Sequence, residues 1–359
     1  MPPARIPVEP GGHSSHPRPW ERCAQGCATG RSGSVTSVSV RVSSAFRGRE
    51  NSVAPLHQHH PRCGYEHDGG ERTARVQDAH GGGGVSARLR ATARQTEQIV
   101  AAGAYRAPGG HEVALAAAIE AARGGTRMHG PGPVQVSQAP PADTFFEVTG
   151  ESSLEAAARL AAAPVAVLNF ASARNPGGGY LNGAQAQEEA LCRASALHTC
   201  LLRAPEFYAH HRAHRDPFYT DRVIHSPAVP VFRDDRGALL DEPFTAGFLT
   251  AAAPNAGVVR RAAPERAGEL PRALAVRAER VLETAAAHGY RRLVLGAWGC
   301  GVFQNDPAQV ARAFSALLGP GGRFAQSFEH VVFGVLARTP GAVVRAAFVR
   351  AFGAPQRQP

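Results

Sequence analysis

Two patterns of apolar residues divide the chain. From residue 86 onward, segments with apolar residues at helical spacing alternate with short, partly β-branched apolar runs, which predicts an α/β fold with a mixed β-sheet sandwiched between helices. Residues 1–85 lack any sustained helical or alternating period and are rich in Gly, Pro, Ser, Arg and His, which predicts a disordered, low-complexity extension. We therefore expect one folded domain over residues 86–359.

The predicted elements alternate along the chain. Helices are expected at 89–102, 111–122, 153–162, 187–202, 273–288, 306–318 and 343–352, the first two being additions that precede the sheet. Strands are expected at 144–148, 165–170, near Val223, near Phe248, at 292–295 and at 330–336. Ser152 or Ser153 is the expected N-cap of the helix over 153–162.

The most informative segment is the loop between the strand at 165–170 and the helix at 187–202. Gly177, Gly178 and Gly179 carry no Cβ where a ligand could approach, and glycine adopts positive φ freely, so the backbone N–H groups there can turn toward an anion. A helix that begins shortly after such a loop also favours an anion at its N-terminus. The sequence therefore predicts a phosphate-binding loop.

Two common nucleotide-binding loops are excluded by the same residues. The loop lacks the Gly-x-Gly-x-x-Gly pattern of dinucleotide-binding folds, and the chain contains no lysine, which a P-loop requires.

Two glutamates, Glu188 and Glu189, occupy the first turn of the helix after the glycine loop. Paired carboxyl groups are typical of general acid–base chemistry, and glycosidases, for example, mostly place the two on opposite sides of the bond that breaks. Adjacent helical residues point roughly 100° apart, so these two cannot flank one bond from opposite sides. Paired glutamates at a helix N-terminus are often only solvated residues that stabilise the helix dipole, but the glycine loop favours a catalytic role for one of them.

The glycines and glutamates together resemble a known signature. Gly177-Gly-Gly179 followed by Gln187-Glu-Glu189, with the second run Leu295-Gly-Ala-Trp-Gly-Cys-Gly-Val-Phe-Gln-Asn-Asp-Pro307, is similar to the poly(ADP-ribose) glycohydrolases, which are macrodomain enzymes, and especially to their compact microbial type. The resemblance extends from about Leu89 to about Phe352 and includes Ser226–Phe232 and Ala253–Asn255. Because each glycine loop follows a predicted strand, we expect the two to form one crevice at the carboxyl ends of a macrodomain-like sheet.

The resemblance implies both an activity and a division of roles. It implies hydrolysis of the ribose–ribose bond of poly(ADP-ribose), with release of ADP-ribose and a preference for the terminal linkage. Glu189 corresponds to the catalytic acid, Glu188 would orient the ribose hydroxyls, and the diphosphate of the substrate would position the attacking water. A non-catalytic ADP-ribose reader is the alternative, although a reader has no need of an acid.

Most of the expected substrate contacts lie in the two loops. They are Asn175, Gly177, Gly178, Gly179, Asn182, Gln187, Gly299, Cys300, Gly301, Val302 and Phe303. Many macrodomains carry Asn-Ala-Ala-Asn before the glycines, whereas this chain has Asn169-Phe-Ala-Ser172. Asn175 or Asn182 could take over the contact of the missing asparagine with the distal ribose, and either could instead be an ordinary turn residue.

Aromatic and sulfur residues of the second loop have two interpretations each. We expect Phe303 to lie against the distal ribose or the nearby base and Trp298 to pack in the core, although both could be core residues. Cys300 could be a nucleophile, but a small residue that fills a tight turn is the simpler interpretation, since no histidine nearby suggests a base.

The net charge of +10 does not distinguish nucleic acid from poly(ADP-ribose), because either polyanion is attracted by a diffuse positive field. No aromatic and basic platform or recognition helix stands out, so we expect no specific nucleic-acid partner. The expected partner is poly(ADP-ribose) or an ADP-ribosylated protein, bound by a monomer.

We expect neither a metal nor a cofactor. The residues Cys23, Cys27, His57, His59, His60 and Cys63 are of zinc-binding types, but their spacing fits no standard zinc site. Cys192, Cys200 and Cys300 are expected to be small buried residues, and His210, His211 and His214 to lie at a solvated helix end. The chain has no signal-peptide h-region and no run of 18 apolar residues, so we expect a cytoplasmic protein.

Overall fold

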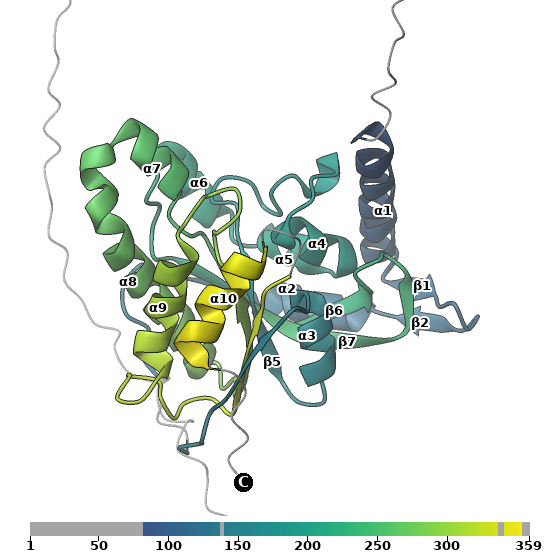
Figure 1. Ribbon diagram of the computed structural model, residues 1–359. Coiled ribbons are helices and arrows are strands. Elements are labelled where there is room, and N and C mark those ends of the chain that lie inside the picture. The colour runs from purple at the N-terminus through teal and green to yellow at the C-terminus, as the bar shows by residue number, and fades with distance from the viewer. Residues whose placement is uncertain (1–81, 137–139, 337–340, 354–359) are drawn as a thin grey trace, which may run out of the picture. The chain divides into compact units, whose positions relative to one another are not determined.

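A seven-stranded mixed sheet forms the centre of the folded unit in the computed structural model, which describes residues 82–136, 140–336 and 341–353 (Figure 1). The strand order is β3-β6-β7-β5-β8-β9-β4. The strands are β3 (Arg127–His129), β4 (Phe145–Thr149), β5 (Val165–Phe170), β6 (Val223–Arg233), β7 (Leu239–Ala251), β8 (Arg292–Gly296) and β9 (His330–Gly334). The five strands from β7 to β4 are parallel, and β6 and β3 complete the sheet in antiparallel pairing. This confirms the predicted α/β sandwich.

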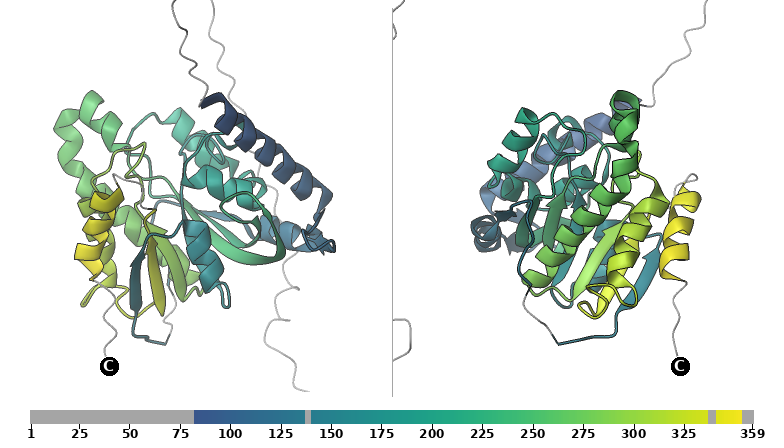
Figure 2. Two further views of the ribbon diagram at one scale, coloured as in Figure 1. Left: turned by 45° about the vertical axis from the view of Figure 1, so that its right-hand side comes forward. Right: turned by 90° about the vertical axis from the view of Figure 1, so that its left-hand side faces the viewer.

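Helices cover both faces of this sheet (Figures 1 and 2). They are α1 (Gly82–Ala102), α2 (Ala116–Gly125), α3 (Ser153–Leu160), α4 (Gln187–Ala194), α5 (Leu197–Leu201), α6 (Pro205–Ala213), α7 (Ala256–Ala262), α8 (Leu270–Ala287), α9 (Pro307–Leu318) and α10 (Gly341–Phe352), with 3₁₀ turns η1 (Tyr180–Asn182) and η2 (Pro264–Glu269). A two-stranded hairpin, β1 (Ala104–Arg106) with β2 (Glu112–Ala114), follows α1.

Alternate residues of the central strand enter two different cores. Val165 and Val167 of β5 pack with apolar residues of α1 to α5, whereas Ala166 and Leu168 pack with α8, α9 and α10 on the other face. All four are at most 1% exposed. A strand that is buried on both faces reads as a continuous apolar run, which explains why its bounds could be predicted from the sequence.

The N-terminal helices differ from their prediction. Helix α1 begins at Gly82, seven residues before the expected start. The expected helix at 111–122 is wrong in its first part, because Glu112–Ala114 pairs with β1 and α2 begins only at Ala116. The break expected at Pro108–Gly110 is the turn of this hairpin. The predicted extension over 1–85 and its Cys and His residues lie outside the described residues, apart from the first turn of α1.

The helix after the first glycine loop is interrupted. Ser195 is extended, with φ of −145° and ψ of 176°, and forms a bridge with Val231 of β6. Its Oγ also accepts a hydrogen bond from the backbone N–H of Leu197 at 3.2 Å, which begins α5. The single helix expected over 187–202 is therefore two helices, because the pairing with β6 stabilises the break.

Helix α6 was not among the predicted elements, and it corrects one prediction. His214 is exposed, as expected, but His211 is only 1% exposed and its Nε2 lies 2.8 Å from Thr220 Oγ1. Burial lowers the pKa of His211 to about 4, so this histidine is a neutral core residue. Among the helices of the described ranges, none has both the length and the hydropathy needed to cross a bilayer.

Candidate active site

The first glycine loop begins where β5 ends. Gly177 and Gly178 have φ of +67° and +59°, in the left-handed region that glycine adopts without a steric penalty. Gly178 N–H donates to Asn175 O at 3.0 Å, which closes a turn and leaves the following amide free to point elsewhere. The loop therefore adopts the left-handed backbone conformation at Gly177 and Gly178 that glycine favours.

Glu189 lies against this loop. Its Oε1 accepts a hydrogen bond from the backbone N–H of Gly179 at 2.9 Å, and the residue is 8% exposed. A Cβ on Gly178 would lie inside van der Waals contact of Glu189 Oε1 and 3.1 Å from Glu188 Oε2. Both carboxyl groups thus pack against Gly178, in space that a side chain at this position would occupy.

Glu188 is more deeply buried than Glu189. Its Oε2 accepts the Ser172 backbone N–H at 2.7 Å, its Oε1 accepts Asn169 Nδ2 at 3.3 Å, and the residue is 3% exposed. Burial, together with the neighbouring Glu189 charge, raises the pKa of Glu188 to about 8 against the hydrogen bonds that favour ionisation. A carboxyl group in this state carries a proton at neutral pH and can donate a hydrogen bond.

Ser172 stands where the resemblance places a second asparagine. Its backbone N–H holds Glu188, and its Oγ accepts the backbone N–H of Asn175 at 3.3 Å. Ser172 therefore stabilises the conformation of the first glycine loop through these two hydrogen bonds. Asn175 and Asn182 are both exposed, and a ribose contact by either stays a prediction.

Gln187, which is expected to contact the substrate, makes three hydrogen bonds within the protein. Its Nε2 donates to Leu168 O at 2.8 Å and to Ser153 Oγ at 3.0 Å, and its Oε1 accepts the Phe170 backbone N–H at 2.9 Å. Both amide hydrogens are used within the protein, so no donor remains for a ligand. Gln187 instead fixes the start of α4 to the end of β5, which places the two glutamates.

The second glycine loop begins where β8 ends. Gly299 has φ of +70°, and a Cβ there would lie 2.5 Å from both Ala253 Cβ and Asn305 Nδ2. Asn305 Nδ2 donates to Pro254 O at 2.8 Å and to Gly299 O at 3.1 Å, so this turn packs tightly against the segment after β7. Gly301 is exposed, with open space where its Cβ would be, and Val302 is 83% exposed.

Ala251, the last residue of β7, joins the two loops. Its carbonyl oxygen accepts the backbone N–H of Ala171 at 3.2 Å, at the start of the first loop, and the Trp298 Nε1–H at 3.0 Å, at the start of the second. Strands β5 and β8 are parallel neighbours, so both loops leave the same edge of the sheet. Trp298 is 1% exposed, which confirms that it packs in the core.

Cys300 and Phe303 flank the exposed residues Gly301 and Val302 in the sequence of the second loop. Cys300 is half-buried rather than buried, and burial raises its pKa to about 12, so the thiol is protonated at neutral pH, unlike an activated nucleophile. Cys192 and Cys200 are buried, as expected. Phe303 is half-buried, and its ring centroid lies 5.8 Å from that of Tyr219.

Tyr219 was not predicted as part of the site. It has φ of +57°, which is uncommon for a residue with a bulky side chain and marks a backbone held by its surroundings. Its position opposite Phe303 comes from the loop before β6, whose path no local sequence pattern determines.

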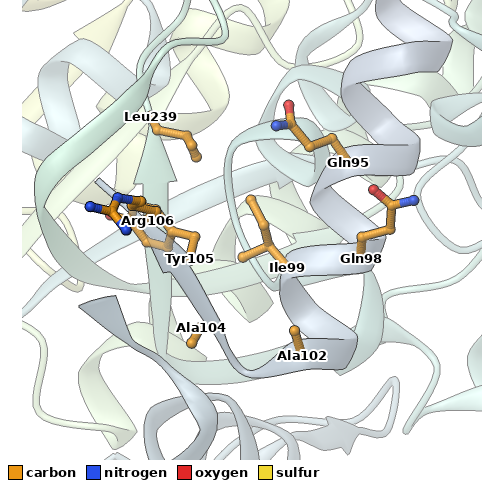
Figure 3. Close-up of a pocket in the computed structure, with 8 residues that line it drawn as sticks. All are labelled: Gln95, Gln98, Ile99, Ala102, Ala104, Tyr105, Arg106 and Leu239. Carbon is orange, nitrogen blue, oxygen red and sulfur yellow. The ribbon is translucent and has the colours of Figure 1, made fainter. Parts of the chain in front are cut away.

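Two further features bear on the choice of site. Within the described ranges, no three His, Cys, Asp or Glu side chains form a group that could hold a metal ion. A hollow of about 360 Å³ lies along the C-terminal half of α1, beside β1 and Leu239 (Figure 3). None of its lining residues belongs to either glycine loop, so it is separate from the paired glutamates.

Comparisons with known proteins find a matching family model and several similar solved structures. A sequence model of the family described as microbial-type PARG, catalytic domain, matches residues 93–234. The chain is similar to the solved poly(ADP-ribose) glycohydrolase from Thermomonospora curvata, with 49% identity, a TM-score of 0.70 and coverage of 74% of this chain and 100% of that chain. The same enzyme bound to the inhibitor ADP-HPD gives 48% identity and a TM-score of 0.69 over the same shares.

A second relative comes from Deinococcus radiodurans. Its poly(ADP-ribose) glycohydrolase in complex with ADP-ribose is 44% identical, with a TM-score of 0.60 and coverage of 66% of this chain and 97% of that chain. Among curated protein sequences, no match to the chain was found.

Proposed function

Because the chain belongs to the microbial-type poly(ADP-ribose) glycohydrolase family, we propose that it hydrolyses the ribose–ribose O-glycosidic bond of poly(ADP-ribose) and releases ADP-ribose. The observation that carries this proposal is the pair of buried carboxyl groups, Glu188 and Glu189, against the backbone of Gly178 and Gly179. Relatives of the same family have been solved with ADP-ribose and with an inhibitor, which supports the same ligand class here.

Glu189 is the proposed general acid. It gives its proton to the oxygen of the leaving ribose while the bond from that oxygen to the anomeric carbon breaks, and the bonding electron pair goes to the oxygen. The anomeric carbon becomes oxocarbenium-like. The Gly179 N–H, which bonds Glu189 Oε1, keeps the carboxyl at the loop and stabilises the carboxylate that remains after transfer.

Water completes the reaction in this proposal. The second carboxylate that other glycosidases place across the bond has no counterpart here, because Glu188 and Glu189 lie on the same turn of α4. The diphosphate, bound by the backbone of the two glycine loops, would position a water molecule for attack on the anomeric carbon. The water oxygen forms the new bond, and its proton goes to the Glu189 carboxylate, which restores the acid.

Glu188 is proposed to orient the ribose hydroxyls. Its pKa near 8 means that it presents an O–H donor at neutral pH, and each carboxyl oxygen retains acceptor capacity beyond the bond that it makes to Ser172 or Asn169. Gln187 is proposed to position α4 rather than touch the substrate. A monomeric state, a cytoplasmic location and a preference for the terminal linkage remain predictions.

The alternative is a reader that binds ADP-ribose with the same loops and does not cleave. The two functions separate when the protein is incubated with poly(ADP-ribose) and free ADP-ribose is followed by chromatography. We expect the wild type to release ADP-ribose from poly(ADP-ribose), and Glu189→Gln to bind ADP-ribose but to leave the polymer uncleaved. Glu120→Gln changes a surface carboxyl that pairs only with Arg123 among the described residues, and we expect it to match the wild type. Binding by the wild type with no release would favour the reader, and abundant oligomers among the early products would exclude the terminal preference.

A further inference from the structure

Helix α1 packs directly against the first glycine loop. It precedes the sheet in sequence, yet the Tyr180 hydroxyl, in the η1 turn that follows the three glycines, has two acceptors on this helix for its one hydrogen, Glu97 Oε1 and Ala93 O. The family match begins only at residue 93, so the first half of α1 lies outside it.

Glu97 is the centre of a small network. Its Oε1 accepts the Tyr180 hydroxyl at 3.0 Å and lies 3.1 Å from His198 Nδ1, and the Tyr180 and His198 rings are 5.1 Å apart. Burial opposes ionisation of Glu97, but the hydrogen bonds and charge of His198, with the Tyr180 hydroxyl, outweigh it and lower the pKa of Glu97. Burial, followed by the Glu97 charge, raises the pKa of Tyr180, so its hydroxyl stays a donor.

His198 carries this network to the glycine loop. It comes from α5 and is 8% exposed, and a Cβ on Gly177 would lie 3.1 Å from its Cδ2 and 3.2 Å from Cys192 Sγ. The Cα of Gly177 therefore faces the edge of the His198 ring, and a side chain would not fit between them unless the ring shifted. A different orientation of that ring would change the packing against Gly177, where φ is +67°.

Helix α1 also holds the far end of the loop. A Cβ on Gly183 would lie 2.5 Å from Ser86 O and 3.0 Å from Arg90 Cγ, and Arg90 NH1 donates to Asn182 O at 3.5 Å. Thr96 Oγ1 donates to Arg193 O at 2.7 Å, in the last turn of α4. Contacts from one helix thus reach the loop and the helix that carries the glutamates.

We propose that Glu97 is a positioning residue for the diphosphate-binding loop, acting through His198 on Gly177 and through Tyr180 on the η1 turn. This inference rests on the proposed function, since it takes the loop to be the diphosphate site. A carboxylate near an anion-binding loop would by itself repel the ligand. The pairing of Glu97 with His198 limits that repulsion, and the hydrogen bond between them fixes the orientation of the imidazole ring.

The test compares two substitutions at one position. Both loop-directed hydrogen bonds end on Glu97 Oε1, so Glu97→Gln keeps an acceptor oxygen, whereas Glu97→Ala removes it. We expect Glu97→Ala to weaken ADP-ribose binding about tenfold and to lower kcat/KM mainly through KM. We expect Glu97→Gln to restore most of this loss, and Glu120→Gln to serve as the matched carboxyl control.

Tyr180→Phe provides a second variant in case Glu97→Ala does not fold. It removes one hydroxyl from the same network, and we expect a smaller loss of ADP-ribose affinity, on the order of threefold. Calorimetric titration with ADP-ribose and the thermal midpoint are measured for every variant. A purely structural role would lower the midpoint of Glu97→Ala while the folded fraction bound ADP-ribose as the wild type does, which would overturn the inference.

The two proposals fail separately. If the wild type neither binds ADP-ribose nor releases it from poly(ADP-ribose), the proposed function is wrong. If the wild type does both and Glu97→Ala and Tyr180→Phe bind ADP-ribose with wild-type affinity, only the positioning role of Glu97 is wrong.

Discussion

The backbone N–H of Gly179 donates a hydrogen bond to Oε1 of Glu189 at 2.9 Å, so the loop proposed to bind the diphosphate also fixes the proposed acid. Movement of the loop and placement of the acid are coupled by this one bond. A change in the length of the Glu189 side chain should therefore affect the reaction more than the binding of product.

Glu189→Asp tests this coupling. The shorter side chain withdraws the carboxyl from Gly179 and from the leaving oxygen by about one methylene, and a misplacement of this size is expected to lower kcat by about 10²-fold. ADP-ribose affinity should change little, because the glycine backbone is intact. Single-turnover release of ADP-ribose and calorimetric titration measure the two effects. A kcat close to wild type would remove Glu189 from the role of acid.

Glu188→Gln should make stability less dependent on pH. The carboxyl has an ordinary pKa of 4.5 when unfolded and about 8 when folded, so the folded state holds the proton more tightly between these values. As pH rises through this range, the unfolded chain loses its proton first, and the wild type loses stability. Glutamine has no proton to lose.

The measurement for Glu188→Gln is the thermal midpoint of both proteins from pH 5 to pH 9. The difference should move in favour of the variant as pH rises, with Glu120→Gln parallel to the wild type. Asn169 Oδ1 is buried and accepts no hydrogen bond from the described residues, so a turn of that amide could receive the new glutamine N–H₂. Parallel curves for Glu188→Gln and wild type would contradict the raised pKa.

Gly178→Ala should damage both folding and activity. The added methyl would overlap Glu189 Oε1, and φ of +59° is unfavourable for alanine, so we expect a loss of about 1–3 kcal/mol in the free energy of unfolding. Gly268→Ala is the matched control, because nothing lies within 4 Å of its Cβ position and its φ is not in the left-handed region. Urea unfolding and ADP-ribose release are compared. Full activity in Gly178→Ala would show that the glutamates do not need the space at this glycine.

Phe303→Ala and Trp298→Ala should act on different properties. Phe303 is half-buried beside Tyr219, and its loss should weaken ADP-ribose binding by up to about tenfold, with little change in the thermal midpoint. Trp298 is 1% exposed and donates to Ala251 O, so its truncation should cost about 3–5 kcal/mol of stability. The opposite assignment of the two effects would place Phe303 in the core and the ligand elsewhere.

Elements with a strong local pattern were predictable from the sequence. The strand Val165–Phe170 is apolar throughout because both of its faces are buried, and its observed bounds are the predicted ones. Gly177 and Gly178 adopt the positive φ that was predicted from the conformational freedom of glycine. Ser152 caps α3 through a capping box with Glu155. In each case the cause lies within a few residues of the effect.

The roles of several site residues came from contacts distant in sequence. Gln187 was expected to touch the substrate, but its amide bonds Ser153 and β5, and no neighbour along the chain announces these partners. His211 was expected in solvent and is buried, because the loop before β6 covers it with Thr220. The helix after the glutamates breaks at Ser195, because β6 offers a partner for its extended backbone.

The sequence by itself determined that a glycine loop, two adjacent glutamates and a second glycine loop follow the strands of an α/β sheet, because spacing, periodicity and the special backbone freedom of glycine are local properties. Only the tertiary structure decided how these parts meet. It brought Ala251 to the start of both loops and buried Glu188 deeply enough to raise its pKa. It also brought Glu97 of α1 within hydrogen-bond distance of His198, which packs beside the first loop. Burial and hydrogen bonding between distant segments depend on packing, which no window of the chain contains.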